Sequence, residues 1–106
     1  MNFQSSPKLT TVQDTKRIKS EQIRLRINLA VAAYAYEYKN DSIMSDADFD
    51  RLSYLVDVDI KTGYRKLDNF FKKNFEPATG MWVRKHPDKK GLENIYHRYF
   101  KDRNND

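Results

Sequence analysis

The chain has no cysteine, and its 106 residues include only three glycines and three prolines. Without cysteine the protein can form neither a disulfide framework nor a thiolate zinc site, and no thiol can act as a nucleophile. The glycines are far apart, which excludes a glycine-rich phosphate-binding loop. The fold must therefore be stabilised by packing.

Long apolar runs are missing as well. No stretch approaches the roughly 20 apolar residues that span a bilayer, and the N-terminus lacks the apolar core of a signal peptide. A chain of this length has room for one small domain. We expect a soluble, cytoplasmic protein that does not bind a membrane, with a flexible N-terminal arm over 1–13, a single helical domain over 14–103 and a disordered tail over 104–106.

Charged residues are abundant and unevenly distributed. The formal net charge is +5, from 20 Lys and Arg against 15 Asp and Glu. Residues 41–60 carry one basic and six acidic side chains, whereas the segments on either side are basic. This pattern is typical of solvated helix faces, and it also suits a binding surface.

The spacing of apolar residues predicts an all-α protein, a small bundle of about four helices. The first and longest helix is expected to begin at Asp14 or Thr15, either of which can cap it, and to end near Tyr38. Its predicted buried face consists of Ile18, Leu25, Leu29, Ala32 and Tyr36.

Two shorter helices are predicted next. Ser45 and Asp48 resemble a capping box, so a second helix should begin there. A third should follow Asp59 or Thr62. Their predicted buried residues are Phe49, Leu52 and Val56 in the second segment, and Leu67, Phe70, Phe71 and Phe75 in the third.

The C-terminal part begins with a proline- and glycine-containing turn over 76–80. A short extended segment is expected near 81–83, and the last helix should begin at Pro87 because proline is favoured at the first helical position. The predicted apolar face of that helix consists of Leu92, Ile95, Tyr96, Tyr99 and Phe100.

No arrangement of residues typical of catalysis is found. The alternating carboxylates of 46–50 differ from a calcium loop, because Arg51 and Asp57 stand where such a loop needs glycine and a bidentate glutamate. Neither His86 nor His97 is accompanied by a cysteine or by a carboxylate at a spacing typical of a catalytic site, and no serine lies in a G-x-S-x-G elbow. We expect no enzyme activity, no catalytic residue and no metal site.

The C-terminal third alternates cations and aromatic residues. Cations there can contact phosphates and a ring can stack on a base, and Trp82 beside Arg84 and Lys85 has the composition of an interface anchor. The alternative is that the aromatic residues of the last helix, Tyr96 and Tyr99, belong to the core. The candidate partner or nucleic-acid contacts are Trp82, Arg84, Lys85, Lys89, Lys90 and Arg98.

The segment from Leu25 to Leu52, LRINLAVAAYAYEYKNDSIMSDADFDRL, resembles the N-terminal helical domain of bacterial NAD-dependent DNA ligases. In that family a tyrosine-rich helix end precedes Asp-Ala-Glu-Tyr-Asp-Arg-Leu, whose place is taken here by residues 46–52. That domain recognises the nicotinamide mononucleotide (NMN) half of NAD, with rings stacking on nicotinamide and carboxylates contacting its amide and ribose. The resemblance implies NMN or NAD as a ligand, and it implies nucleotide-binding roles for Tyr36, Asp46, Phe49 and Asp50.

This sequence departs from the ligase pattern at two of the family's five contact positions, which here are residues 36, 37, 46, 49 and 50, and again beyond the segment. Glu37 stands where the family has histidine, and Phe49 stands where it has tyrosine. Both changes should weaken nucleotide binding. The 106 residues hold no adenylation domain with its nucleophilic lysine, so we expect no ligation, and from Asp59 onward the pattern is different.

Small proteins with such a ligase-like start look like accessory products of bacteriophages and other mobile elements. We therefore expect a non-enzymatic binding protein, a monomer or a homodimer, that docks on a protein or nucleoprotein complex of the bacterial host. It would inhibit that complex, as anti-CRISPR and other anti-defence proteins do. The alternatives are an NMN- or NAD-binding module and a direct nucleic-acid binder that uses the basic C-terminal third.

Overall fold

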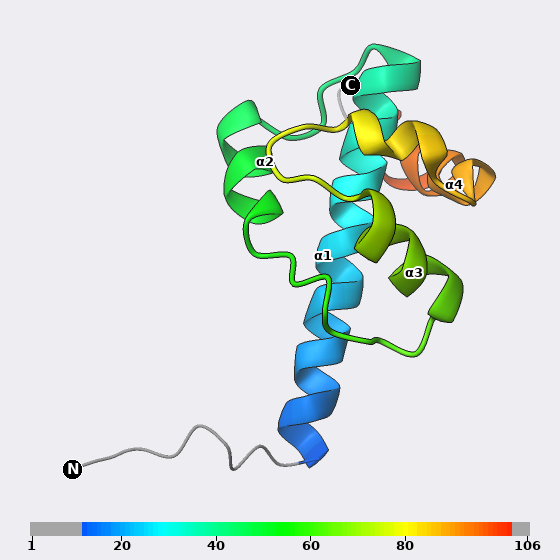
Figure 1. Cartoon of the computed structure of the whole chain (residues 1–106). Helices are drawn as coiled ribbons and strands as arrows, with labels where there is room; N and C mark the ends of the chain where they lie inside the picture. The colour runs from blue at the N-terminus through cyan, green and yellow to red at the C-terminus, as the bar shows by residue number, and fades with distance from the viewer. Residues whose placement is uncertain (1–11, 103–106) are drawn as a thin grey trace.

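The computed structural model describes residues 12–102, in which helices are joined by loops and no strand forms (Figure 1). The predicted all-α class with about four helices is confirmed. The order along the chain is α1 (Val12–Lys39), α2 (Asp46–Ser53), α3 (Arg65–Asn74), the 3-10 helix η1 (Met81–Lys85) and α4 (Lys89–Tyr99). Within residues 12–102, no helix is both long and apolar enough to cross a membrane.

Helix α1 is the axis around which the other elements pack. Helix α2, η1 and α4 all contact it, and Figure 1 shows these elements gathered around its C-terminal half while its first turns project beyond them. Residues 29–35, LAVAAYA, are all buried, because neighbours surround the helix there. The small alanine side chains let those neighbours approach closely.

The single buried face predicted for α1 is therefore only partly right. Leu29 and Ala32 are buried as predicted, but Ile18 and Tyr36 are exposed. Ile18 lies on the projecting turns, and Tyr36 follows the fully enclosed stretch. One stripe at helical spacing does not describe a helix that is bare at one end and covered on all sides further along.

The predicted helix starts also need adjustment. Helix α1 begins at Val12, so residues 12–13, which we assigned to the arm, are helical. The rest of the predicted arm, residue 103 of the predicted domain and the predicted tail over 104–106 lie outside the described residues. Ser45 caps α2 as predicted, since its side chain accepts from the backbone N–H of Asp48 at 3.1 Å. Helix α4 is capped by Asp88 instead of beginning at Pro87.

The sequence suggested an extended segment over 81–83. These residues are instead helical and belong to η1. Its turn is closed by a hydrogen bond from the Val83 N–H to the Gly80 carbonyl, at 3.1 Å. In an extended segment, adjacent side chains would point to opposite sides. The helical turn lets both Trp82 and Val83 enter the core.

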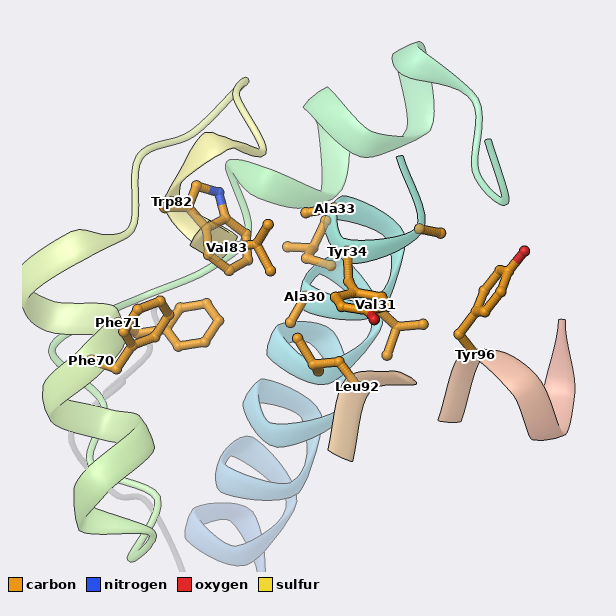
Figure 2. Close-up of a cluster of buried hydrophobic side chains, with 12 residues drawn as sticks. Ala30, Val31, Ala33, Tyr34, Phe70, Phe71, Trp82, Val83, Leu92 and Tyr96 are labelled. Atoms are coloured by element: carbon orange, nitrogen blue, oxygen red, sulfur yellow. The ribbon is translucent and has the colours of Figure 1, made fainter. Parts of the chain in front are cut away.

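The core joins aromatic residues of α3 and η1 to the alanine-rich turns of α1 (Figure 2). The Trp82 ring lies 5.2 Å from the rings of Phe71 and Phe75 and 6.2 Å from that of Phe70. On the other side of α1, Leu92 and Tyr96 of α4 complete the core. Tyr99, predicted on the same face, is exposed because α4 ends there.

A buried polar cluster fixes the long connection between α2 and α3. The Arg26 guanidinium donates to the carbonyls of Asp57 and Ile60 at 2.7 and 2.9 Å and to Asp68 at 3.0 Å. Asp68 also accepts from the N–H and hydroxyl of Thr62. Thr62 was predicted as one of two possible caps of α3, but the N-cap is Tyr64. Thr62 instead donates its N–H and hydroxyl hydrogen bonds to the Asp68 carboxylate inside the helix.

Candidate functional site

A cavity of about 320 Å³ lies between α1, α2 and the loop that precedes η1. Its volume is at the small end of the range for small-molecule sites, about 300–1,000 Å³. Three stretches that are distant in the sequence form its walls. The lining residues are Ala32, Ala33 and Tyr36 from α1; Ser42, Ile43, Met44, Asp46, Phe49 and Asp50 from α2 and the loop before it; and Ala78, Thr79 and Gly80.

All four residues that the ligase resemblance singled out line this one cavity, namely Tyr36, Asp46, Phe49 and Asp50. Asp46 and Asp50 are four residues apart in α2, so their carboxylates are on the same side of the helix. Tyr36 is 64% exposed and Phe49 is half-buried, so both rings are accessible to a ligand.

The electrostatic character of the cavity is negative. Two carboxylates line it, and no Lys or Arg is among the described residues that do so. Aromatic rings attract cations to their faces, and carboxylates accept hydrogen bonds and balance positive charge. The walls therefore suit a flat ligand that carries a positive charge and hydrogen-bond donors.

The loop over 78–80 was predicted as a turn, but its place in the cavity wall was not predicted. Gly80 lies against α1 so closely that an added Cβ would be 3.1 Å from the Cβ of Ala33. Ala78 adopts a left-handed conformation with φ of 68°, which is unfavourable for a residue with a Cβ. The only sequence signal for this wall is the proline–glycine turn itself.

An ion pair joins α1 to η1, the helix that directly follows the cavity loop. Glu37, the residue after Tyr36, accepts from Nε of Arg84 at 2.9 Å and from its Nη2 at 2.8 Å. Glu37 lies one helical turn after Ala33, and Arg84 lies four residues after Gly80. Spacing in the sequence gave no reason to pair residues 37 and 84.

Trp82 is not the exposed interface anchor that the sequence suggested. It is 5% exposed, and its indole N–H donates to the Thr79 carbonyl at 2.6 Å. Burial of the indole among phenylalanine rings removes it from any partner surface. The sequence suggested five basic residues together with Trp82 as partner or nucleic-acid contacts. Because Trp82 is buried, these six residues do not form one surface.

The predicted basic contacts are largely occupied within the molecule. Lys89 donates to the His86 carbonyl at 3.2 Å, and Lys90 lies 3.7 Å from Glu93. The Arg98 guanidinium lies over the ring of Tyr99, 5.7 Å from its centroid. Arg84 is paired as described above, and Lys85 is exposed.

His86 is buried, and it is poorly suited to acid–base catalysis. Burial lowers the pKa of His86 to about 4, and the nearby Asp88 only partly offsets that effect. Its Nδ1 accepts from the Asp88 N–H at 3.0 Å, which fits the neutral ring. Within residues 12–102 no three His, Asp or Glu side chains are close enough together to hold a metal ion.

A second cavity of about 320 Å³ lies between α1, α3 and α4. Its walls are mainly aliphatic, with Ile23, Ile27, Leu67 and Ile95 among them, and the Arg26–Asp68 pair at its polar part. That pair is already satisfied by internal hydrogen bonds. This cavity therefore offers a ligand much less specific recognition than the first one.

No protein-family model, curated protein or solved structure matches this chain.

Proposed function

We propose that the protein is a non-enzymatic module that binds the nicotinamide mononucleotide part of a nucleotide in the cavity between α1, α2 and residues 78–80. The observation that carries this proposal is the convergence of Tyr36, Asp46, Phe49 and Asp50 on one cavity. These residues occupy nucleotide-contact positions of the ligase domain that the chain resembles; three of them match the family, and Phe49 stands in place of a tyrosine.

The chemistry of the cavity supports nicotinamide independently of the resemblance. The oxidised nicotinamide ring is flat and positively charged, so the accessible faces of Tyr36 and Phe49 attract it. The carboxamide N–H groups and the ribose hydroxyls are donors, and the carboxylates of Asp46 and Asp50 accept them. A neutral or anionic ring would gain nothing from the two negative charges.

Calorimetric titration with NMN tests this function. We expect saturable binding that weakens about tenfold in Asp46→Asn and Asp50→Asn, because each change removes one charge-assisted contact of about 1.4 kcal/mol. Reduced NMN, whose ring is uncharged, should bind at least about tenfold more weakly than oxidised NMN.

Asp48→Asn is the matched control for this titration. Asp48 lies between the two cavity carboxylates in the same helix, but it does not line the cavity and is paired with Arg51 at 3.4 Å. Its variant should bind NMN like the wild type. Absence of heat and of competition at millimolar NMN would disprove the proposed function.

A second function, docking on a protein or nucleoprotein complex of the bacterial host, is favoured by one feature of α1. Residues 12–21 are exposed or half-buried, and these turns project beyond the other helices (Figure 1). Lys16 and Lys19 are both exposed there. Such a projecting helix is accessible to a partner even when the cavity is occupied.

Affinity capture from a bacterial lysate, with and without nuclease, tests the docking function. A stoichiometric protein that remains after nuclease and is lost with the Lys16→Glu, Lys19→Glu double variant would support it. Capture that disappears with nuclease would instead indicate direct nucleic-acid binding. Equal capture by the wild type and the double variant would exclude the projecting turns as the docking surface.

A further inference from the structure

The proposed ligand has a phosphate, and the cavity described above provides nothing that attracts one. Asp46 and Asp50 repel an anion, and no described lining residue is a cation. A phosphate must therefore lie outside the carboxylate-rich part, where a cation is held close to the cavity edge. Two exposed arginines lie close in sequence to lining residues: Arg51 follows Asp50 in α2, and Arg84 lies in η1, which directly follows Gly80.

These two arginines differ in the carboxylate that holds them. Arg51 is paired with Asp48, which does not line the cavity. Arg84 is paired with Glu37, which directly follows the lining residue Tyr36 and lies one helical turn after the lining residue Ala33. Of the two, Arg84 is the one anchored beside a cavity wall.

The geometry of the pair leaves Arg84 able to bind a second anion. Both its Nε and its Nη2 lie within 3 Å of a single oxygen, Oε1 of Glu37. A guanidinium has five N–H donors in a fixed plane, so those on Nη1 and one on Nη2 remain for another acceptor. The Arg84 side chain is 57% exposed, whereas that of Glu37 is only 16% exposed. The carboxylate is thus an inner support, and the guanidinium is the outer, accessible group.

We propose that Arg84 binds the 5′-phosphate of the nicotinamide nucleotide and that Glu37 positions its guanidinium. This assignment rests on the proposed function, because it places the phosphate relative to a nicotinamide ring in the cavity. It also gives a role to Glu37, since its negative charge beside a phosphate-bearing ligand is neutralised by Arg84. The site therefore distinguishes the nucleotide from the nucleoside.

Titration of NMN and of nicotinamide riboside, which lacks the phosphate, tests the assignment. The wild type should bind NMN at least about tenfold more tightly than the riboside, and this preference should shrink as salt is added. Arg84→Gln should lower NMN affinity about tenfold and leave riboside affinity within about twofold. Arg51→Gln, a matched change of an exposed, paired arginine on the opposite wall, should alter neither.

The outcomes separate this assignment from the function on which it rests. If neither ligand binds the wild type, the nicotinamide site is wrong and the phosphate assignment falls with it. If both bind equally, or if Arg84→Gln weakens both equally, only the phosphate assignment is wrong. An equal loss in Arg51→Gln would show a general effect of charge, and an NMN preference that does not change with salt would also contradict a contact with Arg84.

Discussion

Trp82 combines two kinds of contact that hold η1 against the rest of the core. Its ring packs on Phe71 of α3 and on Phe75, the C-cap of that helix, and its N–H donates to the Thr79 carbonyl in the cavity loop. The same side chain thus supports the core on one side and the 78–80 wall on the other. We regard it as a structural residue whose loss would affect the candidate site indirectly.

Trp82→Ala should therefore destabilise the fold by about 3–5 kcal/mol, the usual cost of truncating a buried aromatic residue. Urea denaturation followed by circular dichroism measures this change. Met81→Ala is the control: Met81 is the preceding residue in η1 and is 54% exposed, so its truncation should cost less than about 1 kcal/mol. Equal midpoints for the wild type and Trp82→Ala would contradict the buried position of the indole.

Ala78 gives a prediction of the opposite sign. Its φ of 68° is unfavourable for alanine and is readily adopted by glycine, so Ala78→Gly should stabilise the protein by about 1 kcal/mol or less after the entropic cost of glycine. Ala47→Gly in the exposed part of α2 should instead cost about 1 kcal/mol, because glycine is unfavourable inside a helix. Thermal unfolding of both variants measures the difference, and a lower melting temperature for Ala78→Gly would argue against strain in the cavity loop.

At the level of elements, the connection between α2 and α3 depends on one buried ion pair. Arg26 is 4% exposed and Asp68 is 9% exposed. Burial alone would raise the pKa of Asp68, but hydrogen bonds from Thr62 and Gly63 and the charge of Arg26 hold it below its ordinary value. The carboxylate is therefore ionised, and the loop over 54–64 is tied to α1 through the guanidinium.

Asp68→Asn should cost about 3–5 kcal/mol, because it leaves the buried guanidinium of Arg26 without its counter-charge. The control is Asp59→Asn in the same connection, where the carboxylate is exposed and paired with Lys72. That exposed pair should contribute much less to stability than the buried one, because solvent screens it. Chemical denaturation measures the loss of stability in both variants. Equal losses would mean that the buried ion pair stabilises the fold no more than the exposed one.

The same elements show how far the sequence could predict the structure. Apolar spacing and the Ser45 cap located the helices, since these features depend on residues that are close in the chain. The burial of Arg26 and Trp82 depends on partners about 11 to 42 residues away, so local patterns gave no sign that Arg26 is buried and suggested Trp82 as an interface anchor. For the cavity, the resemblance supplied Tyr36, Asp46, Phe49 and Asp50. The sequence predicted a turn over 76–80 but not its place in the cavity wall, and nothing indicated the bond between Glu37 and Arg84.

At the scale of the molecule, the described chain measures 53 × 30 × 23 Å and is elongated along α1. The core occupies only the part where the other helices surround α1, so a few buried groups in that part dominate stability. His86 is the one of these whose ordinary pKa, 6.5, lies near neutral pH. Its ring packs edge-on against Phe70, at 5.0 Å between centroids, and a charge there would be costly.

Stability should therefore decrease on mild acidification. The pKa of His86 is about 4 in the folded chain, against 6.5 as the ordinary value, so the unfolded chain takes up the proton first as pH falls. The stabilisation is fully present above about pH 6.5 and is lost as pH falls toward 4, a decrease of about 2 kcal/mol once solvent screening is allowed for. Lowered pKa values of Asp68 and Glu93 add to this loss only at lower pH, when those carboxylates are protonated.

Urea midpoints between pH 7.5 and 4.5 measure this dependence, with two histidine variants to assign it. His86→Gln should be less stable at neutral pH but should show a flatter profile, because no group at position 86 then titrates. His97→Gln should keep the wild-type slope, since it leaves the buried imidazole of His86 in place and changes a side chain that is 45% exposed. A wild-type profile that is already flat between pH 6.5 and 4.5 would contradict the burial of a neutral imidazole. If the slope were lost in His97→Gln and kept in His86→Gln, the pH-sensitive contact would lie on the surface of α4 and not in the core.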